Sequence, residues 1–210
     1  MVLRCDLSDP SLREAARIVY GGGIIAFPTD TFYGLGACPF DARAVQRIVE
    51  LKERSRRVAP ILVLIRSRAD LSALVGEITP AAERLMEVYW PGPLTLVFRA
   101  AKAAPAMLTA GTGTIGVRLP AHSDVQRVLE AVGGPLTGTS ANRSGRPPAT
   151  TADDVERALG DDVDAILNGG ATPGGLPSTV VDTTVTPPRV IREGRVPMAS
   201  LRSVLTVLAA

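Results

Sequence analysis

Apolar positions recur along the chain with two spacings that alternate from one segment to the next. Apolar residues three and four positions apart, as on one face of a helix, occur in 12–19 and again in 125–132. Short continuous apolar runs, such as 23–27 and 61–65, have the length of buried strands. Interleaved helices and strands are typical of an α/β fold.

Local signals place the ends of these elements. Thr151 and Asp154 resemble a capping box at the start of a helix. Further helices are predicted to begin at Asp9-Pro10, Asp41, Thr79-Pro80, the segment before Val125, and Met198. Further strands are predicted at 94–98, 115–119, 136–139, 165–167, 178–182 and 189–192. No repeat or long linker divides the chain, so we expect one α/β domain over residues 1–210, on a mixed sheet with flanking helices.

The segment 28–36, Pro-Thr-Asp-Thr-Phe-Tyr-Gly-Leu-Gly, follows the apolar strand 23–27. Pro28 cannot donate a ladder hydrogen bond, so the strand should end there. Small hydroxyl side chains at a strand end suit a small polar ligand in a crevice of an α/β sheet. The alternative, that these side chains only make turn hydrogen bonds, stays open.

The helix after Asp41 carries Lys52 on the continuation of its apolar stripe. A lysine in that position points toward the body of the protein. A solvated basic helix end, favoured by the helix dipole, describes Arg56 and Arg57 better than Lys52.

Composition narrows the function. The 210 residues carry a net charge of +2, which excludes a strongly electrostatic nucleic-acid binder but not a local basic patch. No leader sequence and no run of 18 apolar residues is found, which predicts a soluble cytoplasmic protein without membrane contact. Two cysteines and one histidine cannot build a zinc or multi-histidine centre, so no metal site is predicted.

Familiar catalytic motifs fail in context. The glycine pattern of 111–116 precedes a strand, whereas a dinucleotide fingerprint follows one. The segment 138–142 lacks the second glycine of a hydrolase nucleophile elbow, and no histidine follows it.

A constellation of cations remains, each near hydroxyl- or glycine-rich turns. Guanidinium forks bind phosphate or carboxylate, and hydroxyls and turn amides satisfy the remaining oxygens. The set suits a polyanionic ligand beside a small polar one, with catalysis by positioning and charge stabilisation. The cations are Lys52, Arg54, Arg118 and Arg192, and the turn residues are Thr29, Thr31, Thr114, Ser140, Asn142, Ser144 and Ser178.

The chain resembles the YrdC family, the threonylcarbamoyl-AMP synthases that serve tRNA modification next to the anticodon. Seven blocks in the family's order cover nearly the whole chain. They are 28–35, Lys52-Glu53-Arg54, 90–95, Val117-Arg118-Leu119-Pro120, 139–145, Ser178-Thr179-Val180 and 191–194.

The resemblance implies a twisted α/β fold with a concave, positively charged cavity, and a nucleotidyltransferase activity. L-threonine, bicarbonate or CO2, and ATP with Mg2+ would give threonylcarbamoyl-AMP and pyrophosphate, for downstream tRNA threonylcarbamoyl-transfer proteins. By motif position, threonine would be held by Thr31, Arg118 and Ser178. The nucleotide would contact Lys52, Arg54, Thr114, Ser140, Asn142 and Arg192, with catalytic roles for Lys52, Arg54 and Arg118.

Two positions depart from the family pattern. Leu64 stands where a histidine sometimes occurs, and Pro148 where a small hydroxyl residue often contacts the nucleotide. The chain resembles the short form of the family, so a lid over ATP would come from 99–114 or 143–150.

Two other functions compete. An RNA-binding module would use a basic face that includes Lys52, Arg54, Arg56, Arg57 and Arg143, and its binding would weaken steeply with salt. A carbamoyl-transfer domain, as in hydrogenase maturation, would normally sit in a longer chain with acylphosphatase and zinc modules.

Overall fold

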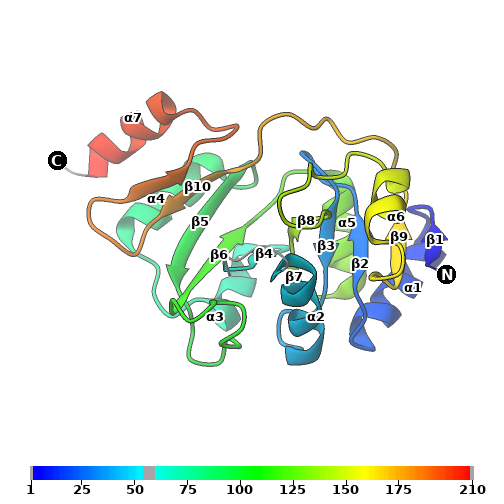
Figure 1. Cartoon of the computed structure of the whole chain (residues 1–210). Coiled ribbons are helices and arrows are strands. Elements are labelled where there is room, and N and C mark those ends of the chain that lie inside the picture. The colour runs from blue at the N-terminus through cyan, green and yellow to red at the C-terminus, as the bar shows by residue number, and fades with distance from the viewer. Residues whose placement is uncertain (1, 54–59, 209–210) are drawn as a thin grey trace.

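The computed structural model describes residues 2–53 and 60–208 and divides the strands between two mixed sheets (Figure 1). The five-stranded sheet has the order β1-β9-β2-β3-β8, and the six-stranded sheet has the order β11-β10-β5-β6-β4-β7. The strands of the five-stranded sheet are β1 (Leu3–Cys5), β9 (Ala165–Leu167), β2 (Ile25–Phe27), β3 (Gly34–Gly36) and β8 (Thr139–Ser140). The strands of the six-stranded sheet are β11 (Arg189–Arg192), β10 (Thr179–Asp182), β5 (Leu94–Arg99), β6 (Thr114–Arg118), β4 (Leu62–Leu64) and β7 (Leu136–Thr137). The prediction of a mixed α/β fold is confirmed, although the strands form two sheets where the spacing suggested one.

Helices pack against both sheets. Helix α1 contacts α5, and their apolar faces share a core with β2 and β9. Helix α4 contacts α7 beside the other sheet, and the Tyr89 hydroxyl donates to the Ser200 carbonyl at 2.9 Å. The helices are α1 (Asp9–Tyr20), α2 (Ala42–Glu53), the 3-10 turn η1 (Arg68–Asp70), α3 (Leu71–Leu74), α4 (Pro80–Tyr89), α5 (Ser123–Val132), α6 (Ala152–Leu159) and α7 (Met198–Leu208).

The predicted cap of α6 is confirmed. The Asp154 backbone N–H donates to Thr151 Oγ1, and the Thr151 N–H donates to the Asp154 carboxylate, each at 3.1 Å. The two bonds satisfy donors that the helix start leaves free, which fixes where α6 begins. Within the described residues, the helices are all too short or too polar to cross a membrane.

The segment 136–140 passes from one sheet into the other. Its first half, β7, pairs with β4, and its second half, β8, pairs with β3. Gly138 lies between them, where a Cβ atom would stand 2.5 Å from Leu64 Cγ. Only glycine permits this close approach without displacing Leu64, so the crossing brings the two sheets together along one edge.

Thr137 fixes this crossing with its side chain. Its fully buried hydroxyl donates to the Leu35 carbonyl at 3.0 Å and accepts from the Ala37 N–H at 2.9 Å. Both partners belong to the β3 region of the five-stranded sheet, whereas Thr137 itself lies in the six-stranded sheet. The hydroxyl therefore links the sheets in a place that water cannot reach.

A second connection runs over the top of the molecule between β9 and β10 (Figure 1). The Gly174 N–H donates to the Thr31 carbonyl at 2.8 Å, and the Tyr33 hydroxyl donates to the Gly170 carbonyl at 2.7 Å. These bonds hold residues 168–178 against the segment that follows β2.

Replacing Thr137 with valine tests the crossing. Thr137→Val keeps the side-chain shape but leaves a buried N–H and a buried carbonyl without this partner, so we expect the free energy of unfolding to fall by about 2 kcal/mol. Urea denaturation measures this, with Thr137→Ser as the matched variant that keeps the hydroxyl. Equal stability of Thr137→Val and wild type would contradict a structural role for the hydroxyl.

Candidate functional site

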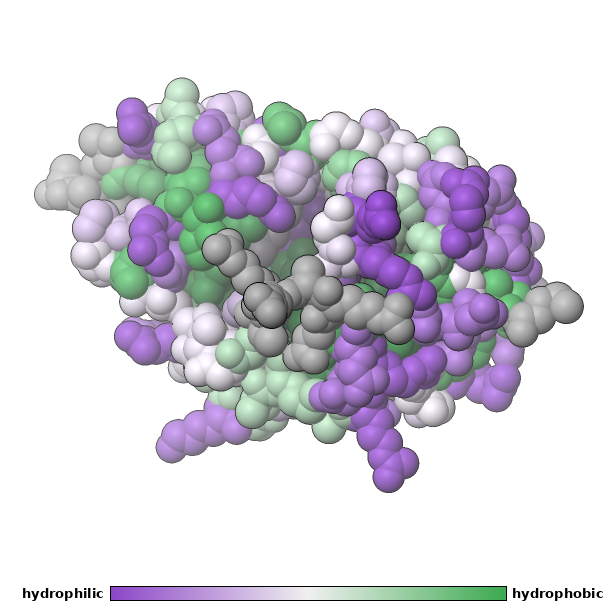
Figure 2. Space-filling model, in the orientation of Figure 1, coloured by the Kyte–Doolittle hydropathy of each residue, from purple (hydrophilic) through white to green (hydrophobic). Residues whose placement is uncertain are grey.

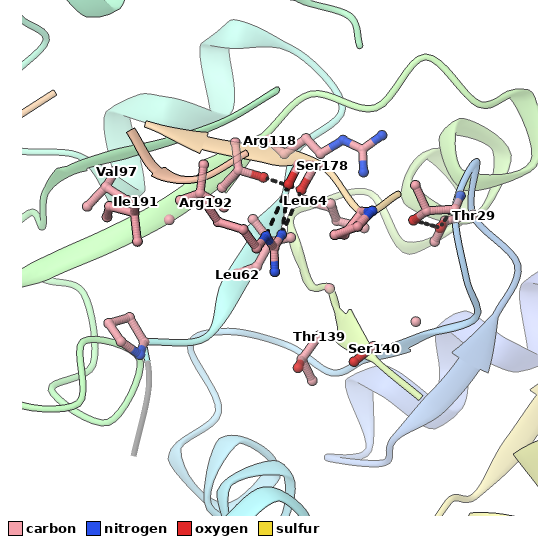
Figure 3. A pocket seen from close by; sticks show the side chains of 18 of the residues that line it. Thr29, Leu62, Leu64, Val97, Arg118, Thr139, Ser140, Ser178, Ile191 and Arg192 are labelled. Carbon is pink, nitrogen blue, oxygen red and sulfur yellow. Dashed lines mark hydrogen bonds between the residues drawn. The ribbon is translucent and has the colours of Figure 1, made fainter. Parts of the chain in front are cut away.

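A pocket of about 870 Å³ lies where the two sheets meet. Figure 3 shows Arg118 and Ser178 on one side of it, with Thr139 and Ser140 opposite. In the view of Figure 2, apolar surface is more frequent toward β5 and β10, and hydrophilic side chains predominate toward α6 and β9. The pocket therefore joins an apolar sheet face, formed by Leu62, Val97, Val180 and Ile191, to a polar end.

Arg118, the last residue of β6, is held rigidly at the polar end. Its side chain is 5% exposed. Nε donates to the Gly92 carbonyl at 2.9 Å, and Nη2 lies 2.6 and 2.5 Å from the two carboxylate oxygens of Asp30. Burial lowers the pKa of Arg118 and Asp30 acts in the opposite direction, so the guanidinium keeps its charge inside the protein.

The segment after β2 forms a compact hydroxyl turn. Thr29 Oγ1 donates to the Phe32 carbonyl at 2.6 Å and accepts from the Thr31 N–H at 3.2 Å. Thr31 Oγ1 lies 3.2 Å from Thr29 Oγ1, and both side chains line the pocket. Thr29 therefore makes turn hydrogen bonds, as the alternative to ligand binding predicted. These bonds hold Thr31 beside the cavity.

Ser178 and Arg192 meet across the β10–β11 hairpin. The Ser178 hydroxyl lies 2.9 Å from Thr95 Oγ1 and is buried. Arg192 Nη2 donates to the Ser178 carbonyl at 2.8 Å. The arginine thus orders the backbone that presents the serine hydroxyl to the pocket.

Lys52 holds the turn after β8. Its Nζ donates to the carbonyls of Ser140 and Asn142, at 2.5 and 2.7 Å, and to Asn142 Oδ1 at 2.9 Å. The Ser144 hydroxyl donates back to the Lys52 carbonyl at 2.6 Å. Burial lowers the pKa of Lys52 to about 8, so at neutral pH the ammonium is largely present to make these bonds. In this structure its donors serve the protein itself.

Most of the predicted site residues gather at the pocket. Lys52 and Asn142 contact Ser140 from outside the lining, and Arg54 lies outside the described residues. The roles assigned to all of them stay predictions. Of the predicted site residues, those that line the pocket are Thr31, Thr114, Arg118, Ser140, Ser178 and Arg192. The two positions that depart from the family pattern, Leu64 and Pro148, line it too.

Neither Asp30 nor Thr95 was predicted from the sequence as a site residue. Asp30 stands 88 positions from Arg118 and Thr95 stands 83 from Ser178, so spacing alone gave no signal for either contact. The only hint for Asp30 was its place between two threonines at a strand end.

The charge of the pocket is more balanced than the resemblance implied. Arg118, Arg189 and Arg192 line it, but so do Asp30 and Asp182. The predicted positive character therefore stays a prediction. Across residues 2–53 and 60–208, no group of three or more His, Cys, Asp or Glu side chains could hold a metal ion.

Comparison with known proteins gives the family. The sequence profile of the Sua5/YciO/YrdC family, described as telomere recombination, matches residues 17–194. A threonylcarbamoyl-AMP synthase of Pyrococcus abyssi is 39% identical over 92% of this chain, and a putative threonylcarbamoyl-AMP synthase of Mycobacterium tuberculosis H37Rv is 36% identical over 98%. The chain belongs to the Sua5/YciO/YrdC family, as the motif blocks predicted.

The relatives differ in length. The chain spans 57% of the Pyrococcus protein but 96% of the mycobacterial one. Among solved structures, P. abyssi Sua5 complexed with L-threonine matches 97% of this chain and 60% of its own, with a TM-score of 0.90 and 37% identity. Escherichia coli YciO matches 96% of this chain and 98% of its own, with a TM-score of 0.83 and 30% identity. HypF, at 21% identity, shares the fold alone.

The hydrogen bonds of Lys52 should hold the turn after β8 in place, and this can be tested. Lys52→Met removes charge-assisted hydrogen bonds to the turn after β8, so we expect a loss of about 2 kcal/mol in unfolding free energy. We also expect faster amide hydrogen exchange in residues 139–146. Lys102, an exposed lysine, gives the matched variant Lys102→Met, which should change neither quantity. Unchanged exchange in Lys52→Met would contradict the anchoring role.

Proposed function

We propose that this chain forms threonylcarbamoyl-AMP and pyrophosphate from L-threonine, bicarbonate or CO2, and ATP. One observation carries the proposal: Thr31, Arg118 and Ser178, assigned to threonine by motif position, line a single pocket although they come from three distant segments. The relatives support it, because the similar proteins include threonylcarbamoyl-AMP synthases and P. abyssi Sua5 has been solved in complex with L-threonine.

The chemistry of the pocket fits this reaction. The carboxylate of threonine suits the guanidinium of Arg118, and its hydroxyl suits the neighbouring hydroxyls of Thr31 and Ser178. The threonine ammonium first loses a proton to solvent, and the free amine then adds to CO2 with loss of a second proton to give a carbamate. A carbamate oxygen attacks the α-phosphorus of ATP, and pyrophosphate leaves. Arg192, with the predicted contributions of Lys52 and Arg54, would stabilise the charge that passes to pyrophosphate.

Mg2+ belongs to the proposal as a companion of ATP. Magnesium usually keeps several waters and binds substrate phosphates with one or two carboxylates, and when bound it neutralises phosphate charge. Asp182 is a carboxylate at the pocket wall, but its Oδ1 already accepts from Thr184 Oγ1 at 2.6 Å. The pocket residues therefore suit a Mg2+ ion that is bound mainly by the ATP phosphates better than one that is bound by protein ligands alone.

The proposed activity implies a cellular location and downstream partners. A cytoplasmic location and delivery of the product to tRNA threonylcarbamoyl-transfer proteins are parts of the same proposal. RNA binding by a basic face remains the competing function, and no contact in the described residues favours it over the synthase.

Pyrophosphate release tests the proposal. With ATP, Mg2+ and bicarbonate present, we expect release to require L-threonine, and L-serine, which lacks one methyl group, to be a poorer substrate. Arg118→Ala should lower kcat/KM for threonine by about 100-fold or more, because it removes a buried charge-assisted partner. Arg99→Ala serves as control, since Arg99 is exposed and pairs loosely with Glu77 at 4.0 Å.

Other results would redirect the assignment. Pyrophosphate release that ignores threonine would contradict the synthase. Salt-sensitive RNA binding without any release would favour the RNA-binding module.

Removal of magnesium gives a separate prediction. Excess EDTA should reduce threonine-dependent pyrophosphate release to background, and added Mg2+ should restore it, while the unfolding temperature of the ligand-free protein stays unchanged. An EDTA-induced drop in that temperature would indicate a resident structural metal instead.

A further inference from the structure

Asp30 is a pocket carboxylate to which no role has been assigned. Its side chain is 17% exposed, lines the cavity, and faces Arg118 with both oxygens. A carboxylate has about four acceptor positions, and Asp30 uses two of them on one nitrogen, Nη2. Acceptor capacity therefore remains on the pocket side.

Arg118 also keeps donors in reserve. Its Nε and Nη2 are engaged by Gly92 and Asp30, and within residues 2–53 and 60–208 no partner is recorded for Nη1. The guanidinium and the carboxylate thus stand side by side at the cavity wall, each with hydrogen-bonding capacity left for a ligand.

Charge balance decides which ligand this pair accepts. The buried pair is neutral by itself. A ligand that brings only a carboxylate to Arg118 would place a second negative charge next to Asp30 in a poorly solvated site, which costs free energy. A ligand that brings an ammonium group together with its carboxylate restores neutrality. The exposed Arg195 also acts on Arg118, but solvent screens it more strongly than the buried pair.

We propose that Asp30 binds the ammonium group of the amino acid while Arg118 binds its carboxylate, so that the pair selects zwitterionic α-amino acids over simple hydroxy acids. The ammonium and carboxylate of an α-amino acid sit on one carbon, a separation that matches two adjacent partners. This inference rests on the proposed function, because it takes threonine as the substrate, and it adds a specificity-determining residue to that site.

Calorimetric titration at pH 7 tests it with two ligands, L-threonine and 3-hydroxybutanoate, which lacks the amine. Wild type should prefer threonine by about 10- to 100-fold, the value of one charge-assisted hydrogen bond. In Asp30→Asn this preference should fall to within about threefold, and in Asp30→Glu, which keeps the charge, it should largely persist.

Asp182→Asn is the matched control. Asp182 lines the same pocket but faces Arg189 at 3.7 Å and Thr184, so its substitution should leave the threonine preference intact. Thermal unfolding of each variant checks that it is folded. If Asp30→Asn does not fold, the affinities for L-threonine and 3-hydroxybutanoate are compared in wild type and in Asp30→Glu. Equal affinity of the wild type for the two ligands overturns the proposal.

The outcomes separate this inference from the proposed function. If Asp30 only holds Arg118 in place, Asp30→Asn weakens both ligands equally and the preference stays, which overturns the inference. If wild type releases pyrophosphate with threonine while that preference is unchanged in Asp30→Asn, only the inference fails. If wild type neither binds threonine nor releases pyrophosphate, the proposed function fails with it.

Discussion

The ion pair between Arg118 and Asp30 joins the two halves of the fold at the place where the pocket forms. Arg118 ends a strand of the six-stranded sheet, and Asp30 follows a strand of the five-stranded sheet. A charged group buried to this extent must keep its partner, because an unpaired buried charge costs several kcal/mol. The requirement that stabilises the contact between the sheets therefore also places opposite charges beside the cavity.

The segment 136–140, which passes from one sheet to the other, also holds the two sheets together. Gly138 lets the chain approach Leu64 closely, and Thr137 bonds to the opposite sheet. Ser140, two residues further on, reaches the pocket and is bonded through Asn142 and Lys52 to helix α2. A continuous set of short-range contacts thus runs from a structural junction to a candidate binding surface, which is how a rigid scaffold presents polar groups in a fixed geometry.

Local chemistry accounts for the features that could be predicted without coordinates. The capping box of α6 depends on residues three positions apart, and the apolar runs at 94–98 and 61–65 became β5 and β4 because such runs bury well on both faces. Family membership was predictable because the motif blocks keep their order along the chain. The division into two sheets was not, since strand pairing depends on contacts between distant residues that spacing does not encode.

The sequence by itself determined the mixed α/β class, most element positions, the family, and the polar residues that could serve a phosphate-bearing and an amino-acid ligand. Tertiary structure alone decided which of them share a cavity. It placed Thr31, Arg118 and Ser178 together, directed the Lys52 ammonium to the backbone of the distant turn after β8, and paired Asp30 with Arg118. The physical reason is that a site depends on the distances between side chains from segments far apart in the sequence. Those distances are fixed only when the two sheets pack together and bury their apolar faces.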